Sequence, residues 1–430
     1  MLLKELEERQ SAGRPIRVGV NGAGWIGGGF VAQVAQMKGM EVTLLADEQV
    51  ALGRRAFESA GVPADRIVEA SSPGPAQDAL RRGMRVVSGS YGLAAQCAEV
   101  DIVVDAGSSP AVGAQTAWSC IQNGKDVVMV NIEADVTVGR ILKRLAAKAG
   151  TLYTVSSGDE PGCLAELWEY VNTLGYEPIA IGKGKNNPLD PEATPQSVSE
   201  SARRDGKDPF QIASYVDGTK TMFEMACAAN ATGCLPIRRG MVGPAADRRT
   251  VCDVFALEED GGIVPFPGVV DFAQGSDLAG GVFITVRVAG GRIADDLKYL
   301  KAGNGRYAAF FRPYHLWFLE APISVARAFL RKEPWLVPLD RPVAEVLTIA
   351  KKDLPAGAKL DAFGGYTFRG SLDRAEEASK LNALPAGLAP GAVLREPVER
   401  GQVVRWDQVE LDEASTVVRL RRQQDALEEE

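Results

Sequence analysis

Residues 18–30 read VGVNGAGWIGGGF, and they carry the strongest signal for the fold of the N-terminal third of the chain. Its glycines form a G-x-G-x-x-G pattern that directly follows an apolar run and opens a helical one. In dinucleotide-binding folds the first glycine makes a tight turn, the second lets a diphosphate approach the backbone, and the third lets helix and strand touch. The N-terminus of such a helix also offers N–H donors to the diphosphate. We therefore predict a cofactor site made by Gly22, Gly24, Trp25, Ile26 and Gly27.

The segments that follow keep alternating short apolar runs with helical patterns. The apolar runs are IRVGV, EVTLLAD, DIVVDAG, DVVMVN and TLYTVSS, and helices are expected near 25–37, 48–60, 111–122 and 137–149. This βαβ rhythm predicts a parallel sheet buried on both faces. We expect an α/β protein in which residues 1–160 form an NAD(P)-binding Rossmann domain with a doubly wound parallel sheet. A glycine-rich turn in an unrelated α/β domain is the weaker alternative, because strand, helix and βαβ unit are all present.

The rest of the chain predicts two further domains. Residues 161–340 mix helices and strands with a polar stretch at 186–209 that suits a lid or dimer arm, which indicates an α+β catalytic and dimerisation domain. Three prolines in RKEPWLVPLDRP mark a boundary near 330–345. The short strands and Gly/Pro turns beyond it predict a small β-rich domain over 341–430 that ends in a charged, frayed helix from Ser415.

The composition narrows the function to small-molecule chemistry. A formal net charge of −8 and a pI near 5.2 argue against nucleic acid or an anionic membrane as the main partner. The six cysteines form no C-x-x-C pair, and the single histidine, His315, cannot complete a Cys/His zinc site with them. The sequence has no apolar signal stretch and no run of about 18 apolar residues, so we expect a cytoplasmic protein.

The acid at the end of the second predicted strand bears on cofactor choice. Asp47 lies where an acidic side chain grips ribose hydroxyls, and Glu48 beside it would repel a 2′-phosphate. Arg54 and Arg55, two helical turns further on, could reach back to such a phosphate or lie solvated on the helix face. NAD and NADP therefore both stay open as the cofactor.

Three later strand ends also carry polar side chains. In an open parallel sheet the carboxyl ends of the strands line the ligand crevice. The run GSSP puts Gly107, Ser108 and Ser109 over the nicotinamide side of the cofactor, with an ordinary helix cap as the alternative. The runs VNIEAD and SSGDEPG add further polar groups to this edge, namely Asn131, Glu133, Asp159 and Glu160.

Lysines in the middle domain suit the chemistry of carbonyl reduction. The run GKGKNN carries Lys183 and Lys185 at a strand end, and YVDGTK carries Asp217 and Lys220 at a helix start. Negative charge develops on the oxygen of a carbonyl under reduction, and a desolvated lysine near carboxylates is a suitable proton donor. The same cations would bind a phosphate or carboxylate of the substrate. The alternative is that these lysines are surface charges in loops.

Together these motifs resemble the homoserine-dehydrogenase-like oxidoreductases that end in a SAF (antifreeze-like) domain, a family that includes 1-deoxyxylulose-5-phosphate reductoisomerase-like enzymes. The resemblance runs over nearly the whole chain, from GAGWIG through DIVVDAGSSP, SSGDEPG, IGKGKNN and YVDGTK to GGYTFRG. It implies a Rossmann domain, an inserted catalytic domain that forms a homodimer, and a SAF-like module from near Val343. It also implies that Lys220 and Asp217 take the roles of the lysine and aspartate of homoserine dehydrogenases. Trp25 departs from the smaller or basic residue that this family often carries, so a preference for NADPH does not transfer simply.

These inferences converge on hydride transfer between NAD or NADP and a small carbonyl or alcohol substrate that carries a phosphate or carboxylate. Lys220 would protonate the substrate oxygen and Lys183 or Lys185 would hold the anionic group. Asp217, Glu133 and Glu160 would orient the lysines or coordinate a divalent ion. The sharper version is a reductoisomerase of a deoxyxylulose-phosphate-like sugar, and the simpler one a dehydrogenase of a hydroxy acid or semialdehyde. Two alternatives stay open: an epimerase or lyase that keeps NAD as an internal redox shuttle, and a non-catalytic dinucleotide sensor.

Overall fold

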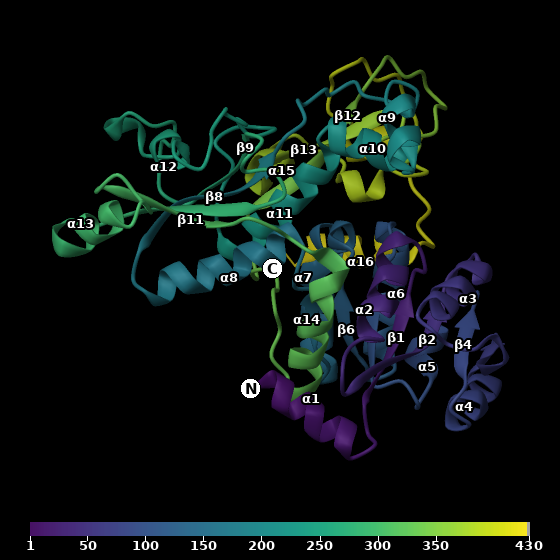
Figure 1. Ribbon diagram of the computed structural model, residues 1–430. Helices are drawn as coiled ribbons and strands as arrows, with labels where there is room; N and C mark the ends of the chain where they lie inside the picture. Colours follow the sequence, from purple (N-terminus) through teal and green to yellow (C-terminus); the bar gives the residue numbers. More distant parts are fainter. Residues whose placement is uncertain (428–430) are drawn as a thin grey trace. The chain divides into compact units, whose positions relative to one another are not determined.

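The computed structural model describes residues 1–427 and divides the chain into two compact units (Figure 1). The first unit contains Met1–Gly162, Leu316–Pro338 and Ala414–Glu430, and the second contains Cys163–His315 and Leu339–Glu413. The units are interleaved in the sequence, in contrast to the three consecutive domains expected. The functional division at 160/161 and 340/341 stays a prediction. Within residues 1–427, no helix combines the length and the apolar character that crossing a bilayer requires.

A parallel sheet of seven strands forms the centre of the first unit, in the order β3-β4-β2-β1-β5-β6-β7. The strands are β1 (Ile16–Asn21), β2 (Met40–Ala46), β3 (Ile67–Glu69), β4 (Arg85–Ser88), β5 (Ile102–Asp105), β6 (Asp126–Met129) and β7 (Tyr153–Val155). The predicted doubly wound parallel sheet is confirmed. The chain winds from β1 toward β3 and then returns to the other side of β1 through β5, so the direction of winding switches between β1 and β5. Ligands of open α/β sheets bind at the carboxyl ends of the strands at such a switch point.

Helices flank this sheet, and their starts follow the sequence signals only in part. They are α1 (Leu2–Ser11), α2 (Trp25–Val34), α3 (Val50–Ser59), α4 (Pro73–Arg81), α5 (Leu93–Gln96), α6 (Pro110–Gln122), α7 (Ile132–Ala149), α14 (Trp317–Arg331), α16 (Thr416–Ala426) and a short 3₁₀ helix η1 (Ala64–Arg66). Helix α7 begins five residues before the predicted position 137, because the Asn131 side chain accepts a hydrogen bond from the Ala134 N–H and caps the first turn.

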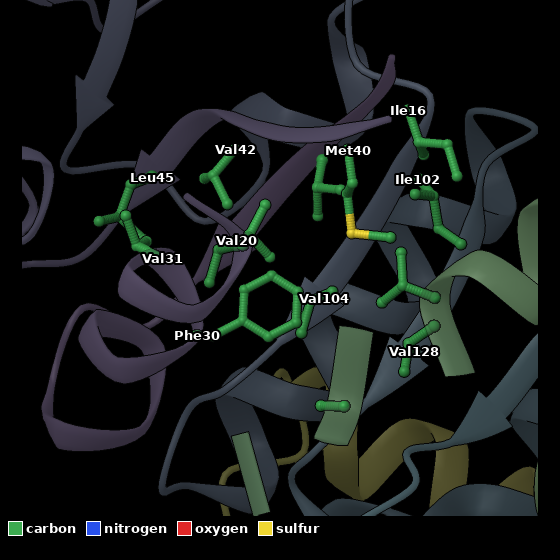
Figure 2. Close-up of a cluster of buried hydrophobic side chains, with 14 of the residues drawn as sticks. Ile16, Val20, Phe30, Val31, Met40, Val42, Leu45, Ile102, Val104 and Val128 are labelled. Atoms are coloured by element: carbon green, nitrogen blue, oxygen red, sulfur yellow. The ribbon is translucent and has the colours of Figure 1, made fainter. Parts of the chain in front are cut away.

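The core of the first unit lies where β1, β2, β5 and β6 meet α2 and α14 (Figure 2). Val20 and Phe30 are fully buried, and Figure 2 shows them packed among aliphatic side chains of the neighbouring strands. Full burial of such a side chain contributes about 1.5–3 kcal/mol. Helix α14 lies three hundred residues from β1 in sequence, yet it supplies Ala321 and Val325 to the same cluster. This packing holds the start of α2, which carries the glycine motif.

The C-terminal helix is docked rather than frayed, so that expectation was wrong. Val417, Val418 and Leu420 of α16 are buried. The Gln424 side chain accepts a hydrogen bond from the Ile141 N–H at 3.1 Å and donates one to the Thr137 carbonyl at 3.3 Å, both in α7. Gln424 thus bridges a donor and an acceptor of the α7 hydrogen-bond ladder. The last three residues of the predicted tail, 428–430, lie outside the described part of the chain.

The second unit is built on a mixed sheet with the order β11-β10-β8-β9. Its strands and helices up to residue 315 are α8 (Glu160–Thr173, which begins in the first unit), β8 (Glu177–Lys185), α9 (Ser199–Asp205), α10 (Pro209–Val216), α11 (Thr219–Thr232), α12 (Val251–Val254), η2 (Glu258–Asp260), β9 (Val269–Gln274), β10 (Val282–Arg287), α13 (Gly291–Tyr299) and β11 (Tyr307–Arg312). Strand β8 pairs in parallel with β9 and antiparallel with β10. The inner strand β8 is therefore hydrogen-bonded along both edges, and this pairing fixes the backbone that carries Lys183 and Lys185.

A β-rich module, residues 339–413, completes the second unit. It contains β12 (Ala344–Ala350), β13 (Phe368–Arg374), α15 (Ala375–Lys380), η3 (Ala386–Leu388), β14 (Val393–Leu394), η4 (Trp406–Gln408) and β15 (Val409–Glu410). Helix α11 contacts β9 of the sheet and also β12 and β13 of this module. Buried residues occur at almost every position of α11 from Thr219 to Asn230, so this helix is the centre of the unit.

Candidate active site

The glycine loop after β1 has the geometry that a bound diphosphate requires. Gly22 has φ +94°, and a Cβ there would lie 2.7 Å from the Ala106 carbonyl oxygen. A Cβ on Gly27 would lie 1.8 Å from the Gly22 carbonyl oxygen, so helix α2 and the loop touch at this point. Gly24 differs, because no atom lies within 4 Å of its Cβ position. This open space beside the N-terminus of α2 fits a diphosphate approaching the backbone.

The acid after β2 is tied to the same loop. One carboxylate oxygen of Asp47 accepts a hydrogen bond from the Ala23 N–H at 2.7 Å, and the other accepts one from the Gln49 N–H at 2.8 Å. Glu48 beside it is exposed. Arg54 donates to the Ile67 carbonyl at 3.3 Å, which directs its guanidinium toward β3, whereas Arg55 is exposed on α3.

Trp25 and Ile26 open helix α2 next to the aromatic start of α14. The Trp25 ring meets the Trp317 ring edge to face, with centroids 5.0 Å apart, and Phe318 at 6.2 Å. Trp25 is about half exposed, with 47% of its side-chain surface accessible, and Ile26 is half-buried. The aromatic contact holds the indole at the mouth of the glycine loop.

The loop after β5 lies directly above a buried acid that the sequence analysis missed. Asp105 is fully buried at the end of β5, and a Cβ on Gly107 would lie 3.4 Å from one of its oxygens. Burial raises the pKa of Asp105 to about 7, although the side chains of Asn131 and Thr116 lower it in part. Asp105 could have been found by the same rule that selected Asp159, because it is a polar residue at a strand end.

Asn131 connects the loop after β5 to the start of α7. Its Nδ2 donates to the Ser109 carbonyl at 2.9 Å while its Oδ1 caps α7. Ser109 stands at the N-cap of α6, where its side chain makes no capping hydrogen bond, and Ser108 is exposed. The loop is therefore positioned by Asn131 rather than by a Ser109 cap, and a role of Ser108 and Ser109 in cofactor binding stays a prediction.

In the second unit, strand β8 brings two of the predicted lysines together. Lys183 and Lys185 are two residues apart and point to the same face of the strand. Lys183 forms an ion pair with Glu224 of α11, which is 4% exposed. Lys185 is 6% exposed and donates to the Asn187 side chain at 2.9 Å and to the Tyr215 carbonyl at 2.7 Å.

Lys220 lies on α11 within the same group of charges. It is half-buried and precedes Glu224 by four residues, so both side chains occupy one face of the helix. Lys183 meets that face at Glu224 and Lys185 meets the chain just before the helix at Tyr215. In sequence, Lys220 therefore lies between Tyr215 of α10 and Glu224 of α11, the residues that Lys185 and Lys183 contact. Lys351, which follows β12, forms an ion pair with Asp217 just before α11. We call Lys183, Lys185, Lys220, Lys351, Asp217 and Glu224 the lysine cluster.

Burial and like charge perturb the lysine on β8 that is least exposed. Burial lowers the pKa of Lys185 to about 8, and the positive charge of Lys183 lowers it as well. The charges of Glu224 and Asp217 oppose this shift. A lysine with a pKa close to neutral pH is suited to binding an anion and to exchanging a proton.

Two family models match this chain over consecutive segments. Residues 22–155 match the NAD-binding domain of homoserine dehydrogenase, and residues 158–321 match the catalytic domain of oxidoreductase DRL. The chain is an NAD(P)-dependent oxidoreductase. The first match contains the glycine loop and Asp47, and the second contains every member of the lysine cluster except Lys351.

Solved structures similar to the oxidoreductase share little sequence with it. A probable dehydrogenase from Thermotoga maritima is 13% identical, with a TM-score of 0.43 over 74% of this chain and 90% of that one. Scyllo-inositol dehydrogenase from Lactobacillus casei, with bound NAD(H) and scyllo-inositol, is 12% identical, with a TM-score of 0.42 over 75% and 91%. The 1-deoxy-D-xylulose 5-phosphate reductoisomerase from Zymomonas mobilis, in complex with NADPH, is 18% identical, with a TM-score of 0.35 over 50% and 58%. A search of curated proteins finds no match.

Asp217 of the oxidoreductase is held by a lysine that the sequence analysis missed. The fully buried Asp217 carboxylate accepts a hydrogen bond from the Thr219 N–H at 2.8 Å and lies 2.7 Å from the Lys351 Nζ. Burial raises the pKa of Asp217, while the charge of Lys351 opposes that shift. Neither Lys351 nor Glu224, which lies in the run YVDGTKTMFEMACAANATG, was singled out from the sequence, because each gains its importance from a partner far away in sequence.

Glu133 and Glu160 belong to the first unit of the oxidoreductase, whereas the lysines belong to the second. Glu133 lies half-buried in the first turn of α7, after β6, and Glu160 is buried at the start of α8, after β7. Both follow strands of the parallel sheet at the edge where ligands bind. Hard divalent cations prefer carboxylate ligands, so Glu133 and Glu160 have the chemistry that the predicted metal site requires.

Proposed function

We propose that this oxidoreductase transfers a hydride between nicotinamide and a small carbonyl or alcohol substrate that carries a phosphate or a carboxylate. The observation that carries the proposal is the pair of neighbouring lysines at the end of β8. Lys185 is 6% exposed, and burial together with the positive charge of Lys183 lowers its pKa to about 8. An anion bound beside the two lysines would offset their mutual repulsion and the cost of burying the charge. A phosphate or carboxylate of the substrate would supply that negative charge.

Within this proposal each lysine has a separate role. The nicotinamide, when bound, supplies or accepts the hydride. Lys220 donates a proton to the oxygen on which negative charge develops, because it is half-buried at the start of α11 and lies one helical turn before Glu224. Lys183 and Lys185 hold the phosphate or carboxylate through charge-assisted hydrogen bonds. Binding the anion beside Lys220 would fix the carbonyl for proton transfer.

The substrate class separates two versions of the reaction. A dehydrogenase of a hydroxy acid or semialdehyde needs only the hydride and one proton. A reductoisomerase of a phosphorylated ketose also rearranges the carbon skeleton before reduction. Glu133 and Glu160 would hold a divalent ion, which would supply Lewis-acid chemistry when bound. The resemblance of the sequence motifs to reductoisomerase-like enzymes supports the second version. The same resemblance supports a homodimer and a SAF-like role for the β-rich module.

The test follows nicotinamide absorbance with NADH and NADPH in parallel against phosphorylated ketoses, semialdehydes and keto acids, with and without Mg²⁺. With the substrate so found, Lys220→Ala is expected to lower kcat by about 10² or more, the usual contribution of a positioned acid. Lys298→Ala, at an exposed position on α13, is the matched control and should leave kcat unchanged. Wild-type turnover by Lys220→Ala would remove Lys220 from the mechanism.

A further inference from the structure

We propose that Lys351 is a positioning residue for catalysis and that the β-rich module thereby belongs to the active site. This inference rests on the proposed role of Lys220. Lys351 follows β12 and is 2% exposed. Its Nζ lies 2.7 Å from Asp217, 2.6 Å from the Ala193 carbonyl and 2.8 Å from the Gly365 carbonyl. The ammonium group donates hydrogen bonds to the two carbonyls and forms an ion pair with the Asp217 carboxylate.

The three acceptors come from three segments that the sequence keeps far apart. Ala193 lies in the polar stretch that follows the β8 lysines, Asp217 closes the turn before α11, and Gly365 lies in the module itself. Lys351 is therefore the point where the loop after β8, the start of α11 and the module are tied together.

Asp217, held by Lys351, in turn binds the first residue of α11. Its carboxylate binds the Thr219 N–H at 2.8 Å, and Lys220 is the next residue. The intervening Gly218 has φ +88°, and a Cβ there would lie 2.6 Å from the Leu189 side chain. Only glycine fits this turn without strain. The position of the Lys220 backbone thus depends on a turn whose one charged side chain is held by Lys351.

A second bond from the module reaches the same turn. The Gly370 N–H of β13 donates to the Thr219 hydroxyl at 2.9 Å, and both groups are buried. A Cβ on Gly370 would lie 2.8 Å from Val346 and 3.2 Å from Thr219. Strand β13 therefore packs closely between β12 and the start of α11, and the module contacts the helix where the proposed proton donor lies.

The energetics of the Lys351–Asp217 ion pair favour a role in positioning the turn before Lys220 over a role in stabilising the fold. Desolvation of two charges offsets most of their attraction, so a buried pair adds little net stability compared with apolar residues of the same volume. It does require one geometry, because any displacement leaves a buried charge unpaired. A pair of this kind at the turn before Lys220 restricts the turn to the arrangement seen here.

The experiment compares Lys351→Met, Lys351→Arg and the double variant Lys351→Met/Asp217→Asn in the full-length protein, with the exposed neighbour Lys352→Met as control. We expect Lys351→Met to lower kcat at least about tenfold while the Kd of the reduced cofactor stays unchanged. The double variant removes both charges, so its melting temperature should return toward the wild-type value while kcat stays low. Lys351→Arg keeps the charge but spreads its donors over a plane, and it should recover only part of kcat.

Two outcomes would overturn the inference. If kcat recovers together with the melting temperature in the double variant, the ion pair serves stability alone. If Lys351→Met folds and turns over like wild type, Lys351 has no positioning role. Parallel assay of Lys220→Ala keeps this result separate from the proposed function. An inactive Lys220→Ala beside a fully active Lys351→Met rejects only the role of the module, whereas an active Lys220→Ala rejects the mechanism itself.

Discussion

The carboxylate of Asp47 accepts a hydrogen bond from the Ala23 N–H at 2.7 Å, which joins the end of β2 to the middle of the glycine loop. The acid that would contact the ribose is therefore held in place by the loop that would contact the diphosphate. Cofactor selection and cofactor binding are expected to depend on one connected structure.

The first prediction concerns this acid. Asp47→Ser should weaken NADH binding about tenfold or more, because a charged acceptor for two ribose hydroxyls is lost. NADPH should lose less affinity, since the same change removes repulsion of its 2′-phosphate. Fluorescence titration with both cofactors measures the ratio of the two Kd values, and Glu58→Ser on the exposed side of α3 is the control. An equal loss for both cofactors would show that Asp47 only shapes the loop.

Substitutions of two glycines in the motif should affect stability and cofactor binding differently. Gly27→Ala places a methyl group 1.8 Å from the Gly22 carbonyl, so it should lower both the melting temperature and cofactor affinity. Gly24→Val enters open space, so it should fold normally and lose only cofactor affinity. Gly74→Ala in α4, also with nothing within 4 Å, should be neutral or slightly stabilising. Normal NADH binding by Gly24→Val would place the diphosphate elsewhere.

Asp105 should make stability depend on pH. Its folded pKa is raised from 3.8 to about 7, so between these values the folded protein keeps a proton that the unfolded chain releases. The free energy of unfolding should therefore fall as pH rises through this window, by at most roughly 1.4 kcal/mol per pH unit. Asp105→Asn should flatten the dependence in urea unfolding between pH 4 and 7, approximately, whereas the exposed Asp65→Asn should not. An unchanged slope in Asp105→Asn would mean that the carboxyl is ionised in the folded state.

Lys185 should set the alkaline limit of activity. Because its pKa is lowered to about 8, the ammonium form declines above that pH, and kcat/KM should fall there if the cation binds the substrate anion. Lys185→Arg stays charged, so its alkaline limb should move to higher pH, although the larger head group lowers the maximum. A pH profile measured between about 6 and 10 separates the two proteins, with Lys298→Arg as the matched control. An identical limb in Lys185→Arg would assign the titration to another group.

Much of the first unit could be predicted from the sequence, because its signals are local. Three glycines at fixed spacing after an apolar run specify a turn, a helix start and a close contact within about ten residues. The strands β3 and β4 were not predicted, although β5, β6 and β7 of the same three or four residues were. Helix α16 looked like a charged tail because its apolar residues are few, and only its docking on α7 shows why they are there.

Local sequence signals were enough to predict the dinucleotide-binding fold, the acid after β2 and the candidate lysines on β8 and α11. Each of these lies in a short segment whose residue types and spacing carry a physical requirement. Which charges meet follows from tertiary packing instead. Lys183 finds Glu224 across 41 residues, and Asp217 finds Lys351 from a different module. A lysine in a buried strand end and one on a surface look identical in sequence. Burial, which sets the pKa of Lys185 and gives the Lys351 pair its strict geometry, comes from packing between distant segments.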